Sequence, residues 1–158
     1  MKKELLKGFT MLMLLVVLAL ATAVASTNAQ SANRVVADIP FEFSVGYKTM
    51  PAGEYSVRTV TTAGNGLMIQ SADGKLAALR LSDETGRSKN NSPARLVFHR
   101  YGERYFLAEV WNGVANTGRR LLKSQEESAI EREFASISAK SETPKNTYET
   151  VEVLAALR

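Results

Sequence analysis

The residues best suited to chemistry lie close together in the middle of the chain. They comprise the only histidine, two arginines and three aromatic residues: His99, Arg100, Tyr101, Arg104, Tyr105 and Trp111. An imidazole can act as a general base near neutral pH. Aromatic rings can stack on sugars or peptide side chains, and guanidinium groups can orient acidic ones. These six residues are therefore the candidate ligand-binding residues.

His99 has two interpretations. As a general base it would need a hydroxyl such as that of Ser88 or Ser92 and a carboxylate such as that of Asp83. The sequence has no nucleophile-elbow motif to support this arrangement. We therefore favour a strand histidine that pairs across a sheet. By the same reasoning, we favour Trp111 as a packed sheet residue and the neighbouring arginines as solvated side chains.

No catalytic residue, metal or cofactor is assigned. The chain has one histidine and no cysteine, whereas zinc sites use three or four ligands from His, Cys and carboxylates. The adjacent acids Asp83 and Glu84 lack the spacing of a calcium loop. A pair of carboxylates could still hydrolyse glycosides if two of them met in the fold. The candidates for such a pair are Glu42, Glu54, Glu103 and Glu109.

The elements that position these residues are predicted to be mainly short antiparallel strands. Apolar and polar residues alternate, and turn residues recur at regular intervals. The clearest unit is a hairpin with arms at 96–100 and 105–111. The polar segment 82–93 shows no apolar periodicity and is predicted to be a long exposed loop.

One helix is predicted near the C-terminus, at about 124–138. Ser124 and Glu127 have the spacing of a capping box. One face of this segment is apolar and consists of Ile130, Phe134 and Ile137. We expect that face to pack on the sheet, and a closing strand at about 148–154. The predicted fold is an antiparallel β-sandwich or a partly closed β-barrel with this one helix.

The N-terminus predicts a helical signal peptide over residues 1–25. Three lysines precede an apolar run, which ends in Ala23-Val24-Ala25. We expect cleavage after Ala25, with Ala29 as the alternative position. If the segment were kept, residues 9–25 would tether the protein to the inner membrane. After cleavage, residues 26–33 are expected to be disordered and 34–158 to form one β-rich domain.

The charge of the mature chain argues against nucleic acid as a partner. The whole chain has 20 basic and 16 acidic residues and a net charge of +4, and the signal segment contributes Glu4 and three of the lysines. Removing that segment leaves a net charge of +2, with no basic stripe. The exported domain has no cysteine for disulfides, so it must rely on its core.

Several motifs resemble those of small exported bacterial proteins that have no assigned function. They are IPFEFSVG at 39–46, MPAGEY at 50–55, LVFHRYGERYFLAEVW at 96–111 and GRRLLKS at 118–124. The resemblance covers most of the mature chain. It implies a secreted β domain with a late helix, and it implies no activity, substrate or site residue.

The leading functional expectation is a non-enzymatic β domain in the periplasm or outside the cell. Its partner would be a cell-envelope component or another protein. One alternative is a secreted hydrolase that uses His99 or a carboxylate pair, and another is an outer-membrane-associated β protein. The segment 35–45 is expected to contain an edge strand, through which the chain would form a weak homodimer.

Overall fold

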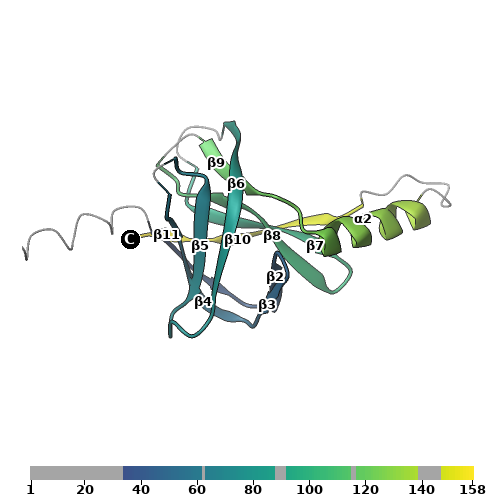
Figure 1. Ribbon diagram of the computed structural model, residues 1–158, viewed down its shortest axis with the longest axis horizontal. Helices are drawn as coiled ribbons and strands as arrows, with labels where there is room; N and C mark the ends of the chain where they lie inside the picture. Colours follow the sequence, from purple (N-terminus) through teal and green to yellow (C-terminus); the bar gives the residue numbers. More distant parts are fainter. Residues whose placement is uncertain (1–33, 62, 88–91, 115–116, 139–146) are drawn as a thin grey trace, which may run out of the picture. The chain divides into compact units, whose positions relative to one another are not determined.

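The computed structural model describes residues 34–61, 63–87, 92–114, 117–138 and 147–158 (Figure 1). All of them belong to one compact unit. The predicted signal segment, its cleavage positions Ala25 and Ala29, and residues 26–33 lie outside the described residues. None of the described residues forms a helix with the length and apolarity that a membrane span requires.

The described chain is mainly β, with one helix. Eleven strands form one sheet: β1 Val35–Ile39, β2 Phe43–Val45, β3 Lys48–Met50, β4 Gly53–Thr59, β5 Gly66–Ser71, β6 Ala77–Arg87, β7 Arg95–Tyr101, β8 Arg104–Trp111, β9 Thr117–Leu121, β10 Glu149–Leu154 and β11 Ala156–Leu157. The helix α2 spans Gln125–Ser138. Along the sheet the order is β10-β7-β8-β9-β6-β5-β4-β1-β11, and β2 pairs with β3 and β8.

The long strand β6 connects the two halves of the sheet (Figure 1). Its residues 77–81 pair with β5, and its residues 82–87 pair with β9. The C-terminal segment contributes the strands at both ends of the order, since β10 pairs with β7 and β11 pairs with β1. Between them, the N–H of Ala155 donates to the carbonyl of Ala94 at 2.9 Å. The two ends of an unclosed sheet are thus consecutive in the chain.

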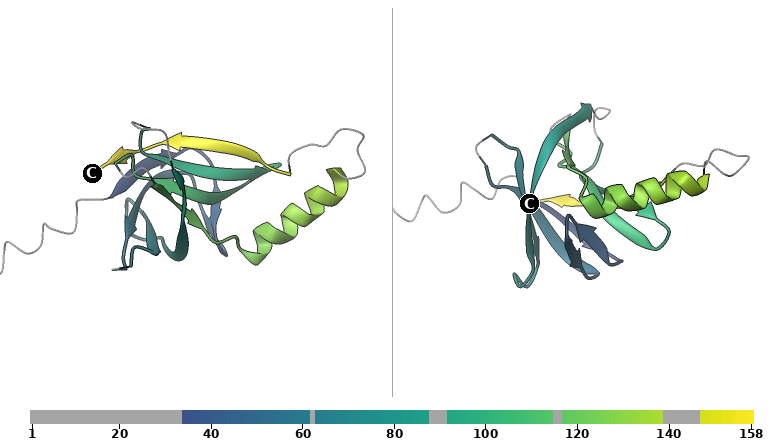
Figure 2. Two further views of the ribbon diagram at one scale, coloured as in Figure 1. Left: turned by 90° about the horizontal axis from the view of Figure 1, so that it is seen from above. Right: turned by 45° about the vertical axis from the view of Figure 1, so that its right-hand side comes forward.

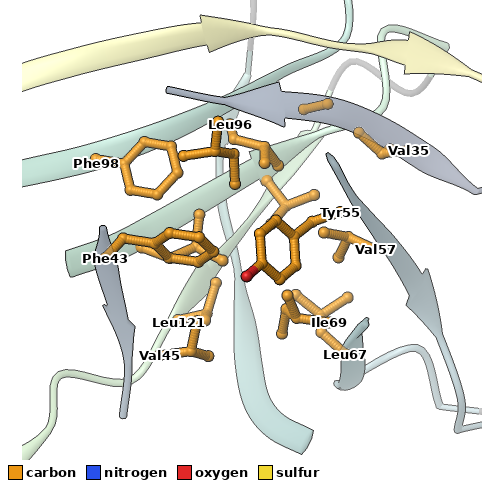
Figure 3. Close-up of a cluster of buried hydrophobic side chains, with 14 of the residues drawn as sticks. Val35, Phe43, Val45, Tyr55, Val57, Leu67, Ile69, Leu96, Phe98 and Leu121 are labelled. Atoms are coloured by element: carbon orange, nitrogen blue, oxygen red, sulfur yellow. The ribbon is translucent and has the colours of Figure 1, made fainter. Parts of the chain in front are cut away.

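The core lies between the two halves of the sheet. Alternate residues of each strand point inward, as period-two patterning requires. Side chains from both halves converge in Figure 3, among them Phe43, Tyr55, Phe98 and Leu121. Burying each of these large side chains contributes about 1.5–3 kcal/mol. This shared core holds the strand ends, and therefore any site at those ends, in fixed positions.

The predicted loop at 82–93 is wrong in its first half, because β6 continues to Arg87. Two of its polar residues are buried and hydrogen-bonded. The hydroxyl of Ser82 donates to the carbonyl of Asn65 at 3.1 Å. Thr85 accepts a hydrogen bond from Arg120 at 2.6 Å. These partners come from the β4–β5 turn and from β9, so local polarity conceals a strand that pairs along its length.

The predicted edge segment 35–45 is paired on both sides for part of its length. Val35 and Val36 pair with both β4 and β11. Ser44 in β2 pairs with Thr49 of β3 and with Phe106 of β8. At these positions a second copy of the chain could not add a strand without displacing an existing one.

The helix packs on the sheet as far as Phe134, and its last turn is exposed at Ile137. Phe134 is half-buried, and its ring centroid lies 6.0 Å from that of Tyr101. Ile137 is 61% exposed, so the expectation that it belongs to the core is wrong. Figures 1 and 2 show α2 extending beyond the tip of the β7–β8 hairpin. The apolar stripe is therefore longer than the surface it covers.

Candidate functional site

The six residues predicted from the sequence do not converge on one pocket. His99 and Tyr101 lie on one face of β7, beside α2. Arg100 lies between them and points to the opposite face, because successive strand side chains alternate. Trp111 lies at the other end of β8.

His99 is bound to the first turn of the helix. Its Nδ1 lies 2.8 Å from Oε1 of Glu127, and the two side chains are 14% and 6% exposed. The ring of Tyr148 lies 4.0 Å from the imidazole, centroid to centroid. The histidine thus has its polar partner on α2, whereas a partner across the sheet was predicted.

The phenol of Tyr101 shares the same carboxylate. It donates to Oε1 of Glu127 at 3.5 Å. Burial, together with the negative charges of Glu127 and Glu131, raises the pKa of Tyr101 far above its ordinary value of 10.0. The phenol therefore stays protonated and acts as a donor. His99 and Tyr101 join the hairpin to the helix through one acceptor oxygen.

The predicted partners of a catalytic histidine lie elsewhere. Asp83 is in β6, opposite Arg120 of β9. Ser92 precedes β7, and Ser88 lies outside the described residues. In the described part of the chain, the observed side-chain contacts of His99 are with Glu127, Tyr101 and Tyr148. None of these is a hydroxyl nucleophile of the predicted kind.

Arg100 and Tyr105 form a stack at the hairpin tip. The guanidinium of Arg100 lies 5.4 Å from the centre of the Tyr105 ring. That ring stacks on Phe41 at 4.0 Å. Arg100 also forms ion pairs with Glu103 at 3.3 Å and with Glu149 at 3.4 Å. The guanidinium is thus engaged with its own hairpin and with β10.

Arg104 lies on the helix side of the hairpin. It forms an ion pair with Glu126 in the first turn of α2. Its guanidinium also lies 5.4 Å from the centre of the Phe106 ring. Arg104 therefore adds a second polar link between β8 and the helix.

Trp111 is a buried sheet residue. Its indole Nε1 donates to Oε2 of Glu109 at 3.0 Å. The guanidinium of Arg95 lies 4.7 Å from the ring centre, and Gly118 leaves the opposite space free of a side chain. Glu109 also accepts a hydrogen bond from Arg120 at 3.2 Å. No other glutamate of the predicted carboxylate set is in contact with Glu109 among the described residues.

A pocket that was not predicted from the sequence lies where several strands begin or end. Its volume is about 280 Å³, near the lower limit of small-molecule sites, roughly 300–1,000 Å³. Its apolar lining comes from Val35, Val57, Leu67 and Val110, all buried. Its polar lining includes Thr59, Glu84, Asn112, Thr117 and Arg119. The lining residues come from the ends of several strands, which explains why no short motif marks the pocket.

Arg119 is one of the charged residues that line this pocket. It shares the inward face of β9 with buried Leu121, since the two residues are two positions apart. Its guanidinium reaches the β4–β5 turn, where a Cβ on Gly64 would lie 2.7 Å from Nη2. Gly64 also has a φ of +73°, which glycine adopts without steric cost. The turn therefore needs glycine both for its backbone and for the space that Arg119 occupies.

Arg119 has a loose ion pair with its neighbour on β6. The distance from its Nη2 to Oε1 of Glu84 is 3.8 Å, which is longer than a hydrogen bond. Arg58 also lines the pocket. The pocket lining therefore combines more positive than negative charge with buried apolar residues.

The sequence contains one usable signal for this site. Thr117, Arg119 and Leu121 alternate with Gly118 and Arg120, which is the pattern of a strand with a charged residue on its inward face. Glu84 had no such signal, because its segment was predicted to be a loop. No group of three or more His, Asp or Glu side chains suited to a metal ion occurs among the described residues.

No family model, curated protein or solved structure matches this chain.

Proposed function

We propose that this protein is an exported, non-enzymatic binding domain whose ligand site is the pocket lined by Arg119. The observation that supports it is that Arg119 lines the same pocket as four buried apolar residues, Val35, Val57, Leu67 and Val110. Such a site suits a small amphipathic group, apolar at one end and polar at the other, presented by a cell-envelope component. The signal-peptide pattern of residues 1–25 supports export.

On this proposal the sheet is a partly closed barrel and the pocket is its open end. The support is that β10 and β11, at the two ends of the strand order, are consecutive in the chain. Small β-barrels commonly bind ligands at their mouths.

A non-enzymatic role fits the surroundings of His99. Its imidazole contacts a carboxylate and two tyrosines that join β7, α2 and the segment before β10. These contacts hold elements together, and they lie on the face of β7 opposite Leu96 and Phe98 of the core. The pocket and the histidine are therefore separate.

The ligand is expected to carry an anionic group. Glu84 is the only observed ion-pair partner of Arg119 among the described residues, and it lies at 3.8 Å. A guanidinium has five N–H donors in a planar fork that suits a carboxylate. A carboxylate ligand would form shorter, charge-assisted hydrogen bonds than Glu84 does.

Thermal unfolding with straight-chain carboxylates tests this proposal. A ligand that binds only the folded state raises the Tm, so carboxylates should stabilise the protein more than alcohols of the same chain length. Arg119→Gln should abolish this difference. Arg120→Gln is the matched control, because Arg120 faces outward toward Glu109. The proposal fails if carboxylates and alcohols act equally on the unaltered protein, or if both variants lose the difference.

N-terminal sequencing tests export separately. Cleavage after Ala25 leaves Ser26 as the first residue, and cleavage after Ala29 leaves Gln30. A chain that still begins with Met1 in the membrane fraction would show a tethered protein. A chain that begins with Met1 in the cytoplasm would contradict export.

A further inference from the structure

Among the described residues, one half of β6 has an edge with no neighbouring strand. Residues 77–81 pair with β5, and pairing with β9 on the other side begins only at Ser82. Two contacts identify the backbone groups at this edge. The carbonyl of Leu81 accepts from the N–H of Leu122 at 3.4 Å, and that of Ala77 accepts from Nζ of Lys48 at 2.9 Å. By alternation, the N–H and C=O of Leu79 face the same edge.

Across this edge lies β3, which pairs with no strand of the described chain other than β2. We call the space between them the β3–β6 seam, defined by residues 46–48 and 77–81. The side chain of Lys48 bridges it to reach Ala77. Paired strands lie about 4.8 Å apart, and a separation that needs a whole lysine side chain leaves β3 and β6 too far apart for a direct ladder. The seam is therefore closed by side chains instead of by backbone pairing.

Arg80 fills the inner side of the seam. Its guanidinium lies 5.9 Å from the centre of the Tyr47 ring and donates to the carbonyl of Leu122 at 3.1 Å. A Cβ on Gly46 would lie 2.7 Å from its Cζ. Its Nε is buried and has no hydrogen-bond partner within the part of the chain that the structure describes, although buried donors are almost always satisfied.

The chemistry of the seam indicates its occupant. Its charged side chains, Lys48 and Arg80, are both cationic, and the buried Nε of Arg80 needs an acceptor. Leu79 and Leu81 are 61% and 58% exposed on the outer face of the same strand. A partner with alternating acidic and apolar side chains would match both faces of the edge.

We propose that the β3–β6 seam binds an extended acidic peptide as an added strand paired with residues 77–79 of β6, since Leu122 already pairs with the Leu81 carbonyl. Such a peptide would replace the ammonium of Lys48 at the Ala77 carbonyl with its own N–H, and would pair with Leu79. Its carboxylates would bind Lys48 and Arg80. This mode of binding is strand addition to a sheet edge. The proposal does not depend on the pocket lined by Arg119.

Amide hydrogen exchange of the unaltered protein tests the proposal directly. The probe is a short capped peptide of alternating glutamate and valine, with lysine in place of glutamate as one control. A second control has proline at alternate positions, which removes backbone donors. The glutamate peptide should slow exchange of the Leu79 amide at least tenfold, and neither control should. Failure to bind, or binding that leaves Leu79 exchange unchanged, would overturn the proposal.

A pair of variants tests the role of charge. Arg80→Gln should weaken binding of the glutamate peptide about tenfold and reduce its advantage over the lysine peptide. Arg132→Gln is the control, because Arg132 is exposed on α2 and its Nε donates to Ser128. Equal affinities of the two variants for the glutamate peptide would contradict a role of Arg80 in binding. The exchange measurement needs no variant, so a poorly folded Arg80→Gln protein leaves the strand-addition test intact.

Discussion

His99 Nδ1 lies 2.8 Å from Oε1 of Glu127, and this contact joins the middle of β7 to the first turn of α2. In a capping box the glutamate commonly turns back to the backbone N–H of the residue that caps the helix. Here its Oε1 faces the hairpin and also accepts from Tyr101. The helix is therefore positioned by a buried acceptor as well as by apolar packing.

Glu127→Ala should lower the free energy of unfolding by about 1–3 kcal/mol. The substitution leaves His99 and Tyr101 without their shared acceptor, and buried groups that lose a partner are costly. Urea unfolding near neutral pH measures the change. Glu126→Ala is the control, because Glu126 forms a partly exposed pair with Arg104, and such pairs contribute about 1 kcal/mol or less. Equal losses for the two variants would contradict the role given to Glu127.

Tyr101 should make the protein sensitive to alkaline pH. Burial raises its pKa above 10.0 in the folded state, so the unfolded chain loses this proton more easily. The contribution of the protonated Tyr101 phenol to the free energy of unfolding is complete below pH 10 and falls as the pH rises above that value. Tyr101→Phe should therefore flatten the decline in the free energy of unfolding above about pH 10.

The control for this prediction is Tyr47→Phe, because Tyr47 is 70% exposed. That variant should keep the slope of the unaltered protein. Tyr55 contributes part of the remaining slope, since burial also raises its pKa. The same slope for Tyr101→Phe as for the unaltered protein would contradict the prediction.

Local signals predicted the elements around His99 but not its partner. Ser124 predicted the start of the helix, and its hydroxyl accepts from the N–H of Glu127 at 3.0 Å. The hairpin arms were predicted within one residue of β7 and β8 at all four of their ends. The contact between His99 and Glu127 depends on long-range packing, which residue spacing does not reveal.

The pocket was missed for a related reason. Its apolar lining includes Val35 and Val110, which look like ordinary core residues in the sequence. Its charged lining includes Arg119, whose guanidinium also reaches Gly64 in a turn that is distant in the sequence. Glu84 lies in a polar strand that is recognisable only through its pairing with β9. The sequence therefore predicts the fold class and the hairpin, whereas the pocket depends on how the two halves of the sheet meet.

Gly118→Ala should destabilise the protein by about 1–3 kcal/mol, because the core must accommodate an overpacked side chain. A Cβ at this position would lie 2.6 Å from the indole of Trp111. Trp111 is the only tryptophan, so its fluorescence should change in the folded state as the ring shifts. Gly86→Ala is the control, since no described residue other than its chain neighbours has an atom within 4 Å of the Cβ position of Gly86. An unchanged spectrum and stability for Gly118→Ala would show that the ring is not held there.

The apolar stripe of α2 should be unequal in its contribution to stability. Phe134→Ala should cost about 2 kcal/mol, roughly half the value for a fully buried phenylalanine, because this ring packs against Tyr101. Ile137→Ala should change the free energy of unfolding by less than about 0.5 kcal/mol. Ile137 is exposed, and alanine favours the helix. Chemical unfolding of both variants measures the difference. A larger cost for Ile137→Ala than for Phe134→Ala would mean that the last turn of the helix packs on a surface, which its exposure in this structure argues against.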